Sequence, residues 1–185
     1  MKSRLTILIV VLGIGAVLLG WVYESQLRTR VETRELVVPD NIDYFLANLK
    51  FRAIDDHGKL EYALQSPRLE HFPRGDLSRI ETPALQIYSP RDDWQVVALE
   101  GEFRHADNLL YLRRDVVMNR EGVDPLRLST ESIRFEPARD FVTTEAEVVI
   151  ETHAGRIEAE RASFDLAAGI YRFTRSSAVY HNDGS

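Results

Sequence analysis

Residues 49–64 read LKFRAIDDHGKLEYAL, and this stretch decides the fold class. Apolar residues occupy every second position of segments 49–53 and 60–64. Such alternation is typical of a β-strand that buries one face. The intervening Asp-Asp-His-Gly at 55–58 is typical of a turn. The stretch therefore predicts a β-hairpin.

Similar short apolar runs continue to the C-terminal end. The further strand candidates are Leu85–Tyr88, Trp94–Leu99, Leu109–Leu112, Val116–Met118, Leu126–Leu128, Ile133–Phe135, Phe141–Thr143, Val148–Ile150, Arg156–Ala159, Ser163–Leu166, Tyr171–Thr174 and Ala178–Tyr180. Seven prolines scattered through this region leave little room for long helices. Only Ile42, Phe45, Leu46 and Leu49 also fit helical spacing, so the entry segment stays ambiguous.

A weak repeat runs through the second half of the chain. The runs starting at Leu109, Phe141 and Tyr171 are each followed, seven residues on, by a second apolar pair. Each unit is a strand, a polar corner and a strand, and the units recur about every 30–32 residues. Such units suggest a β-sandwich, a jelly roll or a short β-solenoid, although any antiparallel meander produces a similar pattern.

Composition limits the class of protein. The chain has 185 residues, 44% of them hydrophobic, which suits one globular domain with an appendage. It contains no cysteine, so disulfides and thiolate metal sites are excluded. Lys2 and Arg4 precede an uncharged stretch; without them, 21 basic residues face 29 acidic ones, a net charge of −8. This charge argues against a nucleic-acid partner.

Residues 5–22 read LTILIVVLGIGAVLLGWV and predict a transmembrane helix. At a rise of about 1.5 Å per residue the run spans roughly 27 Å, close to the hydrocarbon thickness of a bilayer. Trp21 and Tyr23 suit the membrane interface, and no A-x-A-like cleavage site follows. A cleaved signal peptide is the alternative.

The flanking charges predict the orientation of this helix. Residues 1–4 carry only positive charge, which favours a cytoplasmic N-terminus and places the remainder outside the cytoplasm. The expected organisation is a cytoplasmic end at 1–4, a transmembrane helix at 5–22, a linker at 23–40, a β-domain at 41–181 and a C-terminal tail at 182–185.

Catalytic and metal-binding motifs are not found in the sequence. No two of the five histidines lie at metal-ligand spacing, and no H-E-x-x-H, G-x-S-x-G, P-loop or G-x-G-x-x-G occurs. Glu100, Glu102, Glu145 and Glu147 alternate on expected strands and predict a solvated face. We therefore expect no enzymatic activity, no cofactor and no metal.

Large apolar side chains recur on the expected inner face of the strands. If two sheets close tightly, these side chains fill a core. If the sheets splay, the same side chains line a groove for an acyl chain, worth about 0.8 kcal/mol per buried methylene before ordering costs. The sequence leaves both alternatives open.

The order and spacing of several motifs resemble those of the LptC family of lipopolysaccharide export proteins. The motifs are Pro39–Phe45, Asp56–Leu64, Glu81-Thr82-Pro83-x-Leu85, Ala106–Leu112 before Val116, and the His153-Ala-Gly155 turn. The resemblance covers nearly the whole chain, including the N-terminal apolar helix.

The resemblance implies a periplasmic, open antiparallel β-jellyroll behind a single N-terminal transmembrane helix. It implies a protein of the inner membrane that receives lipopolysaccharide from an inner-membrane ABC transporter and passes it to a periplasmic bridge protein of similar fold. It also implies Gly58 and Gly155 as turn glycines, and lipid-facing side chains at Leu49 and Ile80. The full set of lipid-binding candidates is Leu49, Phe51, Tyr62, Ile80, Tyr111, Phe135, Phe173 and Tyr180.

The two terminal strands of such a fold have unpaired backbone groups that partners can cover by β-augmentation. We expect Ala178, Val179 and Tyr180 to dock the bridge protein, and the edge near 46–53 to dock the transporter. Because the domain is acidic, acyl chains should supply the affinity, with Arg113, Arg114 or Arg127 at most steering phosphates. The alternative is an anchored periplasmic scaffold with a closed core and no lipid cargo.

Overall fold

The structure is a computed structural model that describes residues 42–122 and 124–180. Its strands are β1 (Tyr44–Ile54), β2 (Leu60–Phe72), β3 (Leu77–Glu81), β4 (Ala84–Tyr88), β5 (Asp93–Val97), β6 (Glu100–Arg104), β7 (Leu109–Arg120), β8 (Leu126–Glu136), β9 (Phe141–Thr144), β10 (Val148–Thr152), β11 (Gly155–Asp165) and β12 (Ile170–Tyr180). One 3-10 turn, η1 (Pro137–Arg139), lies between β8 and β9. The predicted all-β antiparallel class is confirmed.

The expected transmembrane helix at 5–22, the linker at 23–40 and the tail at 182–185 lie outside the described residues. Within 42–122 and 124–180, no helix has the length and apolarity to cross a bilayer. The expected domain boundaries therefore stay predictions.

The predicted hairpin is confirmed as β1 and β2, which pair antiparallel with Phe51 opposite Leu64. In its turn, the Asp55 carboxylate accepts hydrogen bonds from the backbone N–H groups of His57 and Lys59, both at 2.8 Å. Gly58 has a φ of +82°, which glycine adopts without strain. The entry segment is a strand from Tyr44 onward, so the helical alternative is wrong there.

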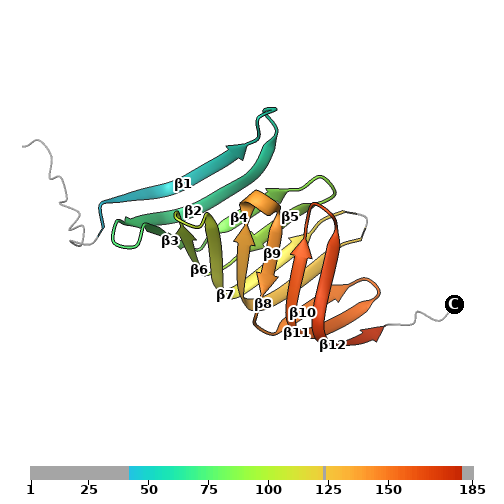
Figure 1. Cartoon of the computed structure of the whole chain (residues 1–185). Helices are drawn as coiled ribbons and strands as arrows, with labels where there is room; N and C mark the ends of the chain where they lie inside the picture. The colour runs from blue at the N-terminus through green and yellow to red at the C-terminus, as the bar shows by residue number, and fades with distance from the viewer. Residues whose placement is uncertain (1–41, 123, 181–185) are drawn as a thin grey trace, which may run out of the picture. The chain divides into compact units, whose positions relative to one another are not determined.

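The twelve strands form nine arms that follow one another as an antiparallel meander (Figure 1). Three arms are made of two short strands each, namely β3 with β4, β5 with β6, and β9 with β10. Each arm pairs along its length with the next arm in sequence, since β2 pairs with both β3 and β4, and β7 with both β5 and β6. The predicted repeat marks every second arm: β7, then β9 with β10, then β12.

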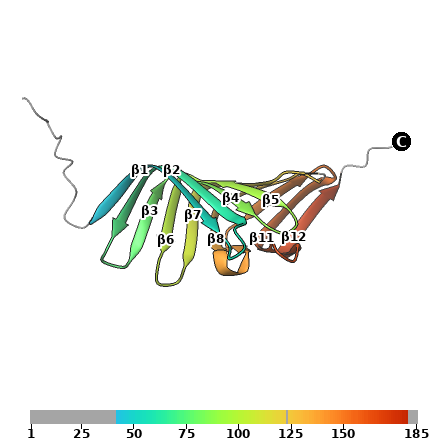
Figure 2. The ribbon, with the colours of Figure 1, turned by 90° about the horizontal axis from the view of Figure 1, so that it is seen from above.

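The arms β3 with β4 and β5 with β6 pass from one layer of a sandwich to the other, because β3 pairs with β6 in one layer and β4 with β5 in the other (Figure 2). The long strands bend where residues adopt positive φ, as at Asn48 in β1, Arg114 in β7 and Arg175 in β12. Where an arm is divided into two short strands, side-chain hydroxyls of the neighbouring strand bond to backbone groups near the gap. Ser66 Oγ donates to the carbonyl of Glu81 at 2.6 Å, and Thr130 Oγ1 to that of Glu147 at 2.8 Å.

The core lies between the layers and consists of side chains at alternate positions, as in Leu85 and Ile87 of β4 or Trp94 and Val96 of β5. Strand β3 was not among the strand candidates, and β6 was expected only through the alternation of Glu100 and Glu102. Strands β3 (LSRIE) and β6 (EGEFR) bury few apolar side chains, and the side chains on their outer faces are mostly charged.

Candidate functional site

A cavity of about 270 Å³ opens between the layers at the β1 end of the meander. Its lining comes from β1 to β4, the β6–β7 region, β8 and η1. Apart from Ser78 and His105 the lining side chains are aliphatic, aromatic or proline: Tyr44, Leu46, Leu49, Phe51, Tyr62, Leu64, Leu69, Ile80, Leu85, Phe103, Leu110, Phe135 and Pro137. The volume lies just below the range of about 300–1,000 Å³ that is usual for small-molecule pockets.

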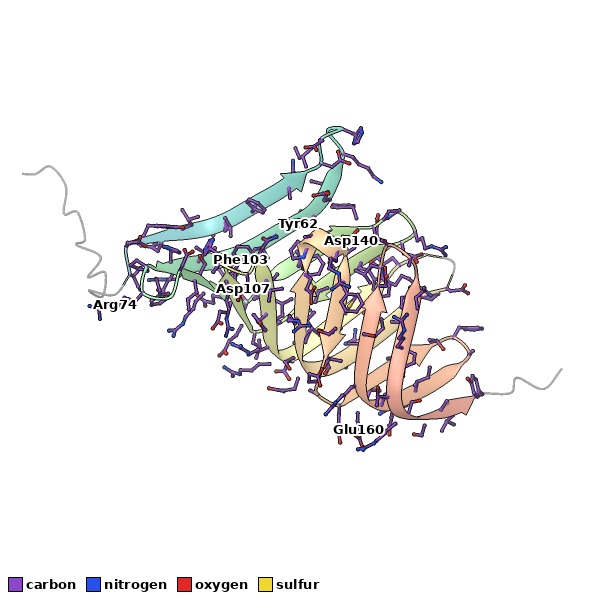
Figure 3. All side chains as sticks on the ribbon, viewed as in Figure 1. Tyr62, Arg74, Phe103, Asp107, Asp140 and Glu160 are labelled. Atoms are coloured by element: carbon purple, nitrogen blue, oxygen red, sulfur yellow. The ribbon has the colours of Figure 1, made fainter. Side chains whose placement is uncertain are left out.

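Strand alternation places these side chains in the cavity. In β1, Leu49 and Phe51 point inward while Lys50 between them is exposed to solvent. The bend at Asn48 keeps Leu46, on the other half of the strand, on the same inner side. Figure 3 shows Tyr62 on β2 and Phe103 on β6, two aromatic side chains of the lining.

The cavity is open along β1. This strand pairs only with β2 among the described residues, so its inner side chains are partly in water. Leu46 is 44% exposed and Phe51 47% exposed. Large apolar side chains with this exposure on one strand form a contiguous apolar rim rather than a closed core.

Towards the C-terminal arms the same inner space is filled. The Tyr62 and Phe135 rings meet edge to face at 6.3 Å. Beyond them, Trp94 and Phe164 are fully buried and in aromatic contact at 6.5 Å. Phe173 packs against Phe164 at 6.0 Å. Both sequence alternatives are therefore present in one domain, a groove at the β1 end and a filled core at the β12 end.

Of the eight lipid-binding candidates, the structure brings Leu49, Phe51, Tyr62, Ile80 and Phe135 together around the cavity. The other three lie elsewhere. Tyr111 does not line the cavity: its neighbours Leu110 and Leu112 are the buried ones, and its own ring is covered by the guanidinium groups of Arg104 and Arg113 on the outer face.

Phe173 and Tyr180 do not line the cavity either, because both belong to β12 at the opposite end of the meander. Phe173 contributes to the filled core there. Tyr180, the last described residue, is 73% exposed, and it lies opposite Gly155 of β11.

Both expected docking edges are edge strands of the described sheet. Strand β12 pairs only with β11, and β1 pairs only with β2. In β12, Ala178, Val179 and Tyr180 are all exposed. Gly155, the expected turn glycine, is the first residue of β11, and a Cβ there would come within 2.1 Å of the Val179 carbonyl oxygen. This glycine allows β12 to approach β11 closely.

The arginines expected to steer phosphates lie on the outer face. Arg113 contacts Glu102 at 3.5 Å, and Arg114 pairs with Glu100. Arg127 is exposed on β8. Burial acts to raise the pKa of Glu102, but the hydrogen bonds and charges of Arg104 and Arg113 outweigh it and hold the pKa below its usual value. The expected solvated face of carboxylates is thus an ion-pair network at Glu100 and Glu102.

Two titratable groups near the cavity are shifted by burial. The pKa of Tyr62, which lines the cavity, is raised by burial and by the charge of Glu61. Asp140 directly follows η1 (Figure 3), and its pKa is raised by burial, then by the charges of Glu61 and Asp165. These carboxylates make the β2–η1 side of the domain acidic.

Sequence reasoning missed the polar end of the cavity. His71 on β2, Ser78 on β3 and His105 after β6 lie together although the two histidines are 34 residues apart in the chain. That separation is close to the length of two arms of the meander. An arm period of about sixteen residues, read from the sequence, could therefore have predicted that the two histidines lie close together.

The fold and the cavity define an all-β protein with an apolar groove between two sandwich layers. The sequence profile of one family, lipopolysaccharide assembly, LptC-related, matches residues 7–181. The chain belongs to this family of lipopolysaccharide transport components, which confirms the resemblance recognised in the sequence.

A solved structure shares the fold. It is the crystal structure of LptH from Pseudomonas aeruginosa, described as the LptA-homologous periplasmic component of the conserved lipopolysaccharide transport device. The TM-score is 0.54 at 9% sequence identity, covering 65% of this chain and 95% of that chain. A sequence search of the curated proteins finds no match.

Proposed function

We propose that this protein is the membrane-anchored relay of a lipopolysaccharide exporter: it receives lipopolysaccharide from an inner-membrane ABC transporter and passes it to a periplasmic bridge protein. The observation that carries the proposal is the apolar cavity between the layers, open along β1. The residues we assign to lipid contact are Leu49, Phe51, Tyr62, Ile80 and Phe135.

The lining suits acyl chains rather than sugar or phosphate. Each methylene moved from water into such a lining contributes about 0.8 kcal/mol. Among the described residues, no arginine or lysine lines the cavity. Since the residues after Arg4 carry a net charge of −8, we infer that the phosphates of the lipid stay outside and that the tails provide the affinity.

The two edge strands are the proposed contacts with the rest of the machine. The free edge of β1, with the segment 46–53, docks the transporter, and the free edge of β12 at Ala178, Val179 and Tyr180 docks the bridge protein. Unpaired backbone groups on both edges among the described residues support this assignment. The segment 5–22 anchors the domain in the inner membrane with residues 1–4 in the cytoplasm.

The second candidate function is an anchored scaffold without lipid cargo. The filled core around Trp94 and Phe164 favours it, because no continuous groove runs through the described domain from β1 to β12. The relay requires the C-terminal arms to open during transfer, whereas the scaffold does not.

Displacement of a hydrophobic fluorescent dye by lipopolysaccharide tests the relay. Phe51→Asp puts a charge on the cavity rim and should lower the affinity for lipopolysaccharide at least about tenfold, since burying a carboxylate among apolar side chains is costly. Ile170→Asp is the matched control, because Ile170 is 46% exposed against 47% for Phe51 but does not line the cavity. Equal loss in both variants, or no displaceable dye in the unmodified protein, would contradict the relay.

A further inference from the structure

One end of the cavity carries a cluster of imidazoles and a carboxylate that the lipid relay does not use. Ligand atoms of His71, Asp76 and His105 all lie within 4.8 Å of one another. We propose that these three residues bind a divalent transition-metal ion of the zinc class at the polar end of the cavity.

The fold places the three side chains from three different segments. His71 is near the end of β2, Asp76 lies in the β2–β3 turn, and His105 lies in the β6–β7 turn. The two turns are joined by a hydrogen bond from the backbone N–H of His105 to the carbonyl of Asp76, at 3.1 Å. This bond ties the backbones of the two turns together, which keeps the side chains of Asp76 and His105 in the same region.

The imidazole nitrogens converge on one point. Nδ1 of His71 lies 3.3 Å from the Ser78 hydroxyl oxygen, and Nε2 of His105 lies 2.9 Å from the same oxygen. Ser78 is only 2% exposed, so both nitrogens point at a buried oxygen, although His105 as a whole residue is exposed. Two imidazole nitrogens that point at the same buried oxygen are already near the positions in which both could bind one metal ion.

Each imidazole contacts a neighbouring aromatic ring. The Tyr44 ring stacks on His71 with a centroid distance of 4.7 Å, and Phe103 contacts His105 edge to face at 4.9 Å. A metal-binding imidazole commonly donates its other ring N–H to a carboxylate. Asp43 is the nearest candidate for that group: its Oδ2 lies 3.9 Å from Nε2 of His71, beyond hydrogen-bond distance, and would have to approach when a metal binds to Nδ1.

The geometry suits zinc after a small closure. Zinc–nitrogen and zinc–oxygen bonds of about 2.0–2.2 Å put tetrahedral ligands roughly 3.4 Å apart. Rotation of the Asp76 and His105 side chains, which are both exposed in turns, is the movement that would bring the ligand atoms closer than 4.8 Å. Two imidazoles and a carboxylate leave a fourth position for water, next to Ser78 and the cavity.

Titration of the full chain with Zn²⁺ tests the site. The protein is purified in detergent without a polyhistidine tag, freed of metal, and titrated against a competing chromophoric chelator. We expect one Zn²⁺ per chain. With Co²⁺ as the probe, we expect the visible absorption of a tetrahedral site.

Variants separate this site from histidines elsewhere. His105→Ala should abolish the one-to-one site, and Asp43→Asn should weaken it about 10- to 100-fold while leaving the ligands in place. His57→Ala and His153→Ala are the controls, since both residues are exposed in distant turns, and they should bind as the unmodified protein does. Circular dichroism confirms that each variant is folded.

Two results would overturn the proposal. One is the absence of a one-to-one Zn²⁺ site in the unmodified chain. The other is unchanged affinity in folded His105→Ala and Asp43→Asn proteins. Lipopolysaccharide displacement measured on the same proteins without metal is independent of both, so failure of this site leaves the relay intact.

Discussion

The two ends of the meander are built from the same kind of arm but differ in what fills the space between the layers. At the β1 end, Leu46 and Phe51 are nearly half exposed around a cavity of about 270 Å³. At the β12 end, Trp94 and Phe164 close the space completely. Since buried apolar side chains supply most of the stability of a domain, we infer that the filled arms stabilise this one and that the hollow arms are free to bind a ligand.

The largest expected effect is a cavity created in the filled half. Trp94→Ala should lower the free energy of unfolding by about 3–5 kcal/mol, because a fully buried side chain is lost and the surrounding core cannot collapse around the space. Phe51→Ala, in the hollow half, should cost about 1 kcal/mol or less because that side chain is 47% exposed. Urea denaturation followed by circular dichroism measures both; equal losses would mean that the two halves do not differ.

The next largest effect is expected at the contact between β11 and β12. Gly155→Ala should destabilise the domain by about 1–3 kcal/mol, because a Cβ would come within 2.1 Å of the Val179 carbonyl oxygen. Gly58→Ala is the control: its φ is also positive, but no atom lies within 4 Å of the added Cβ. Hydrogen exchange should show faster exchange of the β12 amides in Gly155→Ala only. Unchanged β12 protection would contradict the close packing.

A smaller effect concerns two carboxylates with opposite pKa shifts. The pKa of Glu102 is lowered in the folded state, so its contribution to stability is present above its unfolded pKa and is lost as the pH falls through the folded value. Glu102→Gln should therefore be less stable than the unmodified protein near pH 7, and this difference should shrink in acid.

The pKa of Asp140 is raised, so its contribution is present below its unfolded pKa and is lost as the pH rises through the folded value. Asp140→Asn should thus become relatively more stable near pH 7 than in acid; asparagine also tolerates the φ of +47° at this position. Urea denaturation at both pH values checks the pair. If acid changed the stability of both variants, relative to the unmodified protein, in the same direction, one of the two pKa shifts would be assigned in the wrong direction.

Alternation in the sequence was sufficient to predict the β1–β2 hairpin and the all-β class. It could not place Tyr111, because residues 109–112 are all apolar and either face could have been buried. The structure buries Leu110 and Leu112 and leaves Tyr111 under arginines on the outer face. Strand β3 was missed because charged residues on its outer face dilute the apolar pattern, and the same dilution left β6 recognisable only by its alternating glutamates.

The cavity itself could not be predicted from the residues, since the same aromatic side chains would fill a core if the layers closed. Which alternative holds depends on the spacing of the layers, which is set by packing between distant arms. The proximity of His71 and His105 could not be predicted for a similar reason, because it depends on β2, β3 and β6 lying side by side.

Photo-crosslinking along β1 and β3 in cells tests most directly whether the hollow arms bind lipid. A photoreactive residue replaces Leu49, Ile80 or Lys50 in the full chain, and each protein is probed for covalently attached lipopolysaccharide. Leu49 and Ile80 line the cavity, whereas Lys50 is exposed between Leu49 and Phe51. Capture at positions 49 and 80 without capture at 50 is the predicted result. Equal capture at all three positions, or capture at none, would contradict a lipid-binding cavity.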